Sequence, residues 1–199
     1  VITTGISLSG AMPIARIAHT SVRDAYGSGS AIGIAVTTVS ATLSNVCVSG
    51  MNGTGLSLNS TTSELVDSLF ANNGTGISAS LSSASLVKNN TIADDLTRAL
   101  SGDVILENNI MRGLNDPILN GPALASHSNI QQPYTNLYAG LNNHNRNPHF
   151  ISVPDADYRL SAISPAAGTG TAGDDMGASF PSGANPPTPE NLLFSSVTS

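Results

Sequence analysis

The sequence has little of what most proteins use for cross-linking or for chemistry. Its 199 residues include one cysteine, no tryptophan and 4% aromatic residues, and only 10% are charged. A single cysteine excludes an intrachain disulfide and a zinc site built on thiolates. Seven scattered Lys and Arg residues, against thirteen Asp and Glu, argue against a nucleic-acid surface and against anchoring to anionic lipid. No apolar run is long enough to span a membrane, so membrane insertion is not expected.

What the sequence does contain is one short unit, repeated. Pairs that open an apolar run follow each other after 22, 21 and 23 residues: Gly33-Ile34, Gly55-Leu56, Gly76-Ile77 and Ala99-Leu100. A second series is separated by 23, 22 and 19 residues: Asn45-Val46, Ser68-Leu69, Asn90-Thr91 and Asn109-Ile110. Two independent features with one period predict a solenoid, whose repeats bury their apolar faces only by stacking.

The segments between the apolar runs exclude a helical repeat. Residues 49–55 and 71–76 are rich in Gly and Asn, which favour turns and positive φ. Residues 35–42, 56–58 and 77–86 mix aliphatic residues with Ser and Thr in the manner of half-buried strands. The sequence therefore predicts an all-β, single-stranded parallel β-helix of right-handed coils of about 21–23 residues, with about five coils over residues 14–130. The side chains expected to stack inward are Val22, Val46, Leu69, Ile92 and Ile110.

Two stretches carry a family resemblance. Residues 85–92 (SLVKNNTI) and 104–111 (VILENNIM) resemble the coils of the pectate-lyase-like β-helix superfamily. The resemblance covers roughly residues 1–130 and implies that Asn90 and Asn109 form a structural ladder at equivalent turns on adjacent coils. It specifies fold better than function, because the same coil serves lyases, hydrolases, adhesins and surface proteins.

The C-terminal third contains a second set of motifs. NPHF (147–150), DYRL (157–160), SPA (164–166) and DMGA (175–178) follow in the order seen in the closing segment of many bacterial β-helix surface proteins, which they resemble. The sequence departs from that pattern at Ala167-Gly168, where the family more often has an Ile-Asp-x-Gly run. The physical expectation is a cap that covers the open end of the solenoid, with four apolar side chains plugging its core: Phe150, Ile151, Tyr158 and Leu160.

These features divide the chain into three parts: coils over residues 1–130, a capping segment over 131–180, and a Pro-rich linker over 181–199. The last thirteen residues (187–199) resemble the first strand of a fibronectin type III domain, which implies a modular extracellular parent with neighbouring modules. Because residues 1–8 already have the pattern of a strand, we expect the chain to begin within a longer protein.

Candidate chemistry is sparse. A polysaccharide lyase needs a base and a group that neutralises the substrate carboxylate, and the nearest approach is Lys88 with Arg98 and Arg112. A solvated charged face is the competing interpretation, in which Lys88, Glu107 and His127 stack on successive coils as a salt-bridge ladder. Four aspartates could bind Ca²⁺: Asp155, Asp157, Asp174 and Asp175. Capping of turns is the commoner role of such residues, and no other cofactor is indicated.

Two further sets of reactive residues are expected to have ordinary structural roles. His19, Arg23, Asp24 and Tyr26 lie beside a repeat lengthened to 28 residues, where an ordinary polar turn is expected. Cys47 lies in an apolar run, where a small side chain packed between coils is expected.

Three functions remain open. The favoured one is a non-catalytic extracellular module that is structural or adhesive, or that binds a polysaccharide or cell-surface glycan. The second is the C-terminal part of a polysaccharide lyase or glycoside hydrolase that acts on acidic polysaccharide. The third is a self-associating surface or filament protein.

Overall fold

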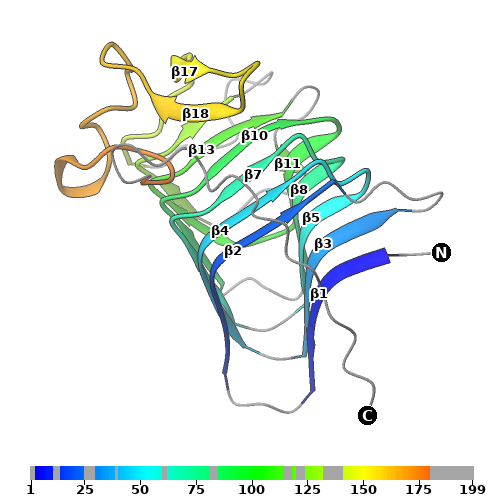
Figure 1. Ribbon diagram of the computed structural model, residues 1–199. Helices are drawn as coiled ribbons and strands as arrows, with labels where there is room; N and C mark the ends of the chain where they lie inside the picture. The colour runs from blue at the N-terminus through cyan, green and yellow to red at the C-terminus, as the bar shows by residue number, and fades with distance from the viewer. Residues whose placement is uncertain are drawn as a thin grey trace.

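The computed structural model describes residues 3–10, 14–24, 30–38, 40–59, 62–80, 85–113, 118–119, 124–131 and 141–179. These residues form a parallel β-solenoid whose two walls face each other across the core (Figure 1). One wall, sheet A, has the order β1 (Thr3–Ser9), β3 (Ala31–Thr37), β5 (Thr54–Asn59), β8 (Thr75–Ser80), β11 (Arg98–Ser101) and β14 (Ile118–Leu119). The predicted all-β parallel solenoid is confirmed.

The other wall, sheet B, begins with two long strands, β2 (Ala15–Arg23) and β4 (Ala41–Ser49). In later coils each long strand is divided at a corner into a first and a second part. The first parts are β6 (Glu64–Val66), β9 (Leu86–Lys88), β12 (Ile105–Glu107) and β15 (Leu124–Ser126). The second parts are β7 (Leu69–Ala71), β10 (Thr91–Asp95), β13 (Ile110–Gly113) and β16 (Asn129–Ile130).

The glycine series keeps its predicted register. Ile34 pairs with Leu56, Leu56 with Ile77, and Ile77 with Leu100 in parallel. Glycine precedes these residues because the coils approach closely there. A Cβ on Gly33 would lie 2.7 Å from the Gly55 carbonyl oxygen, and one on Gly55 would lie 2.7 Å from that of Gly76.

The predicted register of the second series was wrong by one residue at its first member. Val46 aligns with Ser68, because its N–H donates to Ser68 Oγ at 3.1 Å, and it is Cys47 that pairs with Leu69. The expected strand over residues 35–42 is likewise interrupted: β3 ends at Thr37, and Thr38 has a φ of 59°. Both errors arise from single turn residues that the period does not reveal.

The five side chains predicted to stack inward therefore belong to three different columns. The one that fills the core is Val22, Val48, Phe70, Ile92, Met111 and Ile130, each paired with the next. Val46 also belongs to the main core, but Leu69 and Ile110 face away from it. Alternation along a strand explains the error, since a shift of one residue moves a side chain to the other face of the sheet.

A chain of polar residues, the corner ladder, joins the coils where the first and second parts of sheet B meet. Its members are Ser68, Asn90, Asn109, Ser128 and Asn143, and each accepts a backbone N–H from the coil before it at 2.9–3.1 Å. Asn90 Nδ2 also donates to Asn109 Oδ1 at 3.2 Å. The residue before each ladder member has positive φ: Asp67, Asn89, Asn108, His127 and Asn142. Asn and Asp tolerate this conformation best, which accounts for the Asn-Asn pairs of the sequence.

The C-terminal segment lies against the side of the solenoid. His144 forms a parallel bridge with Asn129, which continues sheet B. The chain then forms the antiparallel hairpin β17 (Phe150–Ser152) and β18 (Asp157–Leu160) and the short 3₁₀ helix η1 (Thr171–Gly173). Figure 1 shows this part, in yellow and orange, beside the outer side of β10 and β13. We call residues 150–178 the strap.

The strap packs on the outer face of sheet B, so the expectation that its apolar residues plug the solenoid core was wrong. Tyr158 packs with Cys47, Leu69, Ala71 and Ala93. A second cluster joins Ala166 and Met176 to Ile110. Phe150 packs beside both clusters, and Leu160 packs beside the second one. Ile151 is 52% exposed. The strap takes this position because Leu69 and Ile110 leave an outward apolar face that needs cover.

Candidate functional site

The three candidate catalytic cations lie on three different surfaces. Lys88 projects from β9 and forms a salt bridge of 2.9 Å with Glu107 on β12. That hydrogen bond holds the pKa of Glu107 below its usual value, with a further contribution from Thr171, whose Oγ1 donates to Glu107 at 3.1 Å. His127 follows the stacked position by one residue, since Ser126 is the residue that pairs with Glu107.

The two arginines lie away from that pair. Arg98 is on β11, where it pairs with Thr75 in sheet A, and its Nε is buried without a hydrogen-bond partner. Arg112 is on β13, opposite Ala93, and its Nη1 donates to the Arg146 carbonyl at 3.3 Å. Burial lowers the pKa of Arg112, whereas the charge of Asp94 raises it. The three candidate cations therefore do not converge on one surface.

The structure instead assembles a polar group that the sequence did not indicate, which we call the Tyr158 cluster: Asn72, Asp94, Arg112 and Tyr158. Asn72 Nδ2 donates to Tyr158 Oη at 3.2 Å. Asn72 and Asp94 occupy the same position 22 residues apart, both with a φ of 56°. The spacing of Asn72 and Asp94 is visible in the sequence, but nothing in it shows that β18 lies over them.

The chemistry available to this cluster is limited by Tyr158. Its side chain is 2% exposed, and burial, then the charge of Asp94 and its hydrogen bond, raise the pKa of Tyr158 above its usual value. A tyrosine of this kind stays neutral at physiological pH and cannot act as a base there. Its ring contacts Phe150 edge-on, with centroids 5.3 Å apart. The arrangement therefore anchors the strap through one buried aromatic side chain.

Three of the four candidate Ca²⁺ ligands bind groups of the strap itself. Ser152 Oγ donates to Asp155 at 2.6 Å, and Arg159 forms two hydrogen bonds with Asp157, at 2.8 and 2.6 Å. Asp175 accepts the Gly168 N–H at 2.8 Å, and Asp174 is exposed. Within the ranges that the structure describes, no three His, Cys, Asp or Glu side chains gather in a way that could hold a metal ion.

Arg23, beside the lengthened first repeat, also has structural partners, whereas His19 and Asp24 are exposed. Arg23 Nε donates to Ser21 Oγ at 3.2 Å, and Arg23 Nη2 approaches Cys47 Sγ at 3.9 Å. Cys47 is 3% exposed and lies under the strap, on the outer face of the sheet, and burial raises its thiol pKa. Tyr26, the fourth member of that group, lies outside the described residues.

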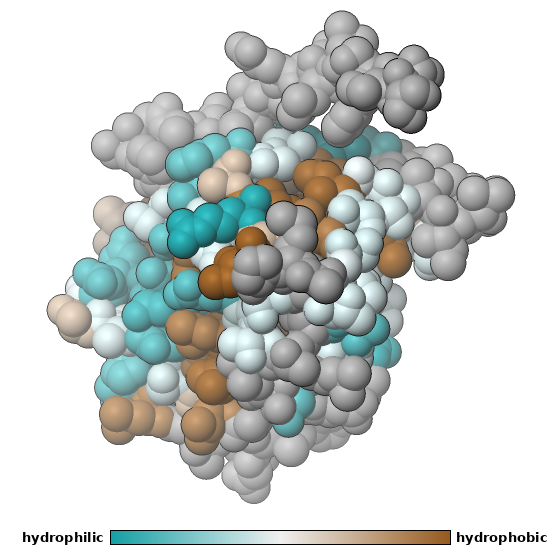
Figure 2. Space-filling view, turned by 90° about the horizontal axis from the view of Figure 1, so that it is seen from below, coloured by the Kyte–Doolittle hydropathy of each residue, from teal (hydrophilic) through white to brown (hydrophobic). Residues whose placement is uncertain are grey.

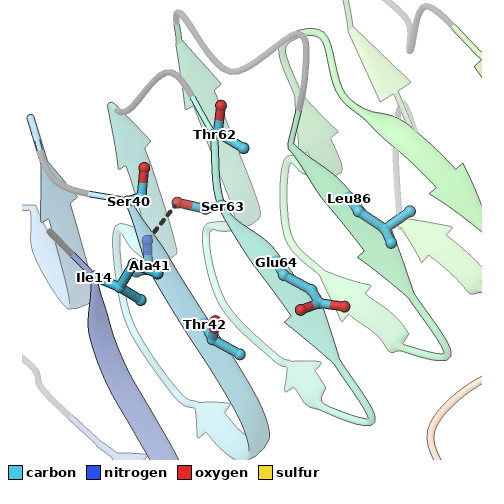
Figure 3. A pocket seen from close by; sticks show the side chains of 8 residues that line it. All are labelled: Ile14, Ser40, Ala41, Thr42, Thr62, Ser63, Glu64 and Leu86. Carbon is cyan, nitrogen blue, oxygen red and sulfur yellow. Dashed lines mark hydrogen bonds between the residues drawn. The ribbon is translucent and has the colours of Figure 1, made fainter.

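A shallow depression of about 240 Å³ lies where the chain enters sheet B (Figure 3). It is lined by Ile14, Ser40, Ala41, Thr42, Thr62, Ser63, Glu64 and Leu86. Ser63 Oγ accepts the Ala41 N–H at 3.1 Å, so this hydroxyl already serves the backbone. Seen from below, described apolar residues lie among polar ones (Figure 2). Glu64 is the one ionisable group in the lining, so the depression has no pair of groups that could act as acid and base.

The outer face of sheet A is regular and carries short polar side chains. Thr54 pairs with Thr75, Ser57 with Ser78, and Asn59 with Ser80 in the same register. Ser101 extends the serine column and Arg98 the threonine column. Successive strands are about 4.8 Å apart, so these groups form rows at that spacing. Such a face can donate and accept hydrogen bonds but offers little else.

Comparison with known families places residues 4–144 under a model described as the right handed beta helix region. No curated protein and no solved structure matches the chain. The described residues also contain no helix long and apolar enough to cross a membrane.

Proposed function

The chain belongs to the right-handed beta helix family, and from this premise we propose that it is a non-catalytic, rod-like module of a larger secreted or cell-surface protein, with a structural, adhesive or glycan-binding role. The Pro-rich linker and the fibronectin type III resemblance lie outside the described residues. They support the modular, extracellular part of the proposal through sequence alone.

One observation carries the non-catalytic part. The outer face of β7, β10 and β13 is occupied by the strap. Cleavage of a glycosidic bond needs at least two positioned ionisable groups in one groove open to the sugar. Arg112 lies on this face but bonds to the Arg146 carbonyl, and Lys88, on the first part of sheet B, is paired with Glu107.

The glycan-binding part has its best surface on the outer face of sheet A. Its rows of Thr, Ser and Asn side chains can exchange hydrogen bonds with sugar hydroxyls. Aromatic side chains, which supply much of the apolar contact with a ligand, make up only 4% of the sequence. Affinity is therefore expected to be weak, about millimolar, and to depend on many copies of the module or on its neighbours.

Incubation of the purified chain with pectate, alginate and glycosaminoglycans tests the proposal. We expect no unsaturated products by ultraviolet absorbance and no new reducing ends. Weak retention on immobilised polysaccharide should be lost when Ser57→Glu and Ser78→Glu are combined, and kept in Thr42→Glu on the other wall. Retention that neither change affects would move the glycan-binding surface away from sheet A, and no retention of the wild type would remove the glycan-binding role and leave the structural or adhesive role.

The second candidate is part of a lyase acting on acidic polysaccharide. It is favoured by Arg112, because this half-exposed guanidinium, together with Asp94 within the Tyr158 cluster, is the nearest approach to a paired acid and base. Turnover that Arg112→Ala or Lys88→Ala abolishes, and that Arg16→Ala on the exposed side of β2 leaves intact, would replace the first proposal with this one.

A further inference from the structure

A second, shorter ladder lies at the end of the second part of sheet B. The Met51 N–H donates to Asn73 Oδ1 at 3.1 Å, and the Asn73 N–H donates to Asp95 Oδ1 at 2.9 Å. Asn73 also uses its amide group in the other direction, since its Nδ2 donates to the Val48 carbonyl at 3.2 Å. A complete ladder residue thus accepts one hydrogen bond and donates another.

The corner ladder repeats this geometry three times. The Nδ2 atoms of Asn90, Asn109 and Asn143 donate to the carbonyls of Leu65, Val87 and Ala125, at 3.0, 2.7 and 2.8 Å. Donation back to a carbonyl of the preceding coil is therefore a general property of the asparagine ladder positions. It satisfies the buried amide and adds a bond between coils.

Asp95 stands at a ladder position but has the wrong atom for this bond. It is fully buried, and Oδ2, which takes the place of Nδ2, has no hydrogen-bond partner. The carbonyl equivalent to that of Val48 belongs to Phe70, since these two residues pair in adjacent strands. Two oxygen acceptors facing each other without a proton repel, and a buried unpaired carboxylate is costly.

We propose that Asp95 is held in the folded protein as a neutral carboxylic acid whose Oδ2–H donates to the Phe70 carbonyl, which makes this ladder a pH-sensitive link between coils. In this form Asp95 matches asparagine at every bond, as acceptor at Oδ1 and donor at Oδ2. Ionisation removes the donor and leaves a buried charge beside a carbonyl.

The surroundings of Asp95 favour the neutral form. Burial raises its pKa well above the usual 3.8, the bonds from Asn73 lower it, and the adjacent charge of Asp94 raises it again. The strands packed against it supply Asn73, Gly76 and Gly113, none of which titrates. Tyr158 of the strap is within electrostatic reach and is itself neutral.

The direction of the effect follows from linkage. Asp95 binds its proton more tightly in the folded than in the unfolded protein, so its stabilisation is fully present below the unfolded pKa, near 3.8. It is lost as pH rises through the raised folded pKa. The coils at this corner, and the strap that Asn72 and Asp94 help to anchor, are therefore weakest at alkaline pH.

Melting temperatures of the full chain measured from about pH 4 to pH 9 test the proposal, with Asp95→Asn as the variant and Asp103→Asn, an exposed aspartate, as the matched control. Asparagine should supply the missing donor permanently. We expect Asp95→Asn to melt close to the wild type near pH 4 and about 3 °C or more above it near pH 8, and Asp103→Asn to follow the wild type throughout.

Infrared difference spectra of wild type and Asp95→Asn give a second measurement that does not depend on stability. A protonated carboxyl stretch in the wild type at neutral pH, absent from the variant, is expected. Parallel melting curves for the two proteins, or no such band, would overturn the proposal.

Discussion

At the scale of single residues, the polar groups inside this protein matter as much as the apolar ones. Asn90 is fully buried, yet its side chain accepts the Ser68 N–H and donates to the carbonyls of Leu65 and Lys88. The chain must turn a corner at this point, and the turn leaves backbone groups without sheet partners. The ladder side chains satisfy these groups, which explains why a buried position is occupied by asparagine.

Replacement of Asn90 by alanine should lower the free energy of unfolding by about 2 to 4 kcal/mol, because buried backbone partners on both sides lose their bonds. Urea denaturation measures this loss. The control is Asn89→Ala, one residue earlier and half-buried, whose side chain accepts one bond from Asn108 Nδ2 at 2.8 Å. It should cost less than Asn90→Ala, about 1 to 2 kcal/mol, because it loses that bond and places alanine at a positive φ. Equal losses in the two variants would mean that the ladder contributes nothing special.

At the scale of elements, the strap is the part whose role is least obvious from its sequence. It is attached by backbone and side-chain bonds to Asn108 and Thr91, and by the packing of Tyr158. The apolar residues beneath it would otherwise be an exposed patch. The strap thus stabilises the outer face of sheet B and also excludes ligands from it.

Tyr158→Ala should destabilise the protein by about 3 to 5 kcal/mol, through loss of an aromatic side chain buried between the strap and the sheet. It should also raise the rate at which a thiol reagent modifies Cys47, which lies in the same cluster. Ile151→Ala, at a side chain 52% exposed on the same hairpin, is the control and should change stability by less than about 0.5 kcal/mol. A Cys47 that reacts at the wild-type rate in Tyr158→Ala would show that the strap stays in place without this anchor.

At the scale of the whole molecule, stability is distributed along the rod. Each coil contacts its neighbours, so a central residue loses packing on two sides when truncated and a terminal residue on one. The column that contains Ile6, Ile34, Leu56, Ile77 and Leu100 offers a matched comparison, since its end and its middle are both isoleucine.

We expect Ile77→Ala to cost about 3 to 4 kcal/mol, because the side chain is fully buried, and Ile6→Ala, only partly buried, to cost about 1 kcal/mol. Urea unfolding curves of the two variants provide the measurement. A loss at Ile6 as large as that at Ile77 would contradict the nearest-neighbour picture and indicate a rod that unfolds as one unit from either end.

The amino-acid sequence by itself determined the fold class and the period of the coils. Both are properties of neighbouring repeats: the glycines at 33, 55 and 76 recur because each backbone approaches the next coil, and the asparagine pairs recur because each coil turns the same corner. A contact between adjacent copies of a repeat leaves its trace at a fixed spacing in the chain. The Lys88 and Glu107 salt bridge was predictable for the same reason.

Only the tertiary structure decided the rest. The position of the strap depends on contacts between residues 86 apart, such as Asn72 and Tyr158, and such contacts leave no period. The register of Val46 and Leu69 depended on one residue, which alternation in a strand converts into opposite faces. The protonation proposed for Asp95 follows from an acceptor without a donor in a buried ladder, and an unpaired buried atom cannot be seen until the chain is folded around it.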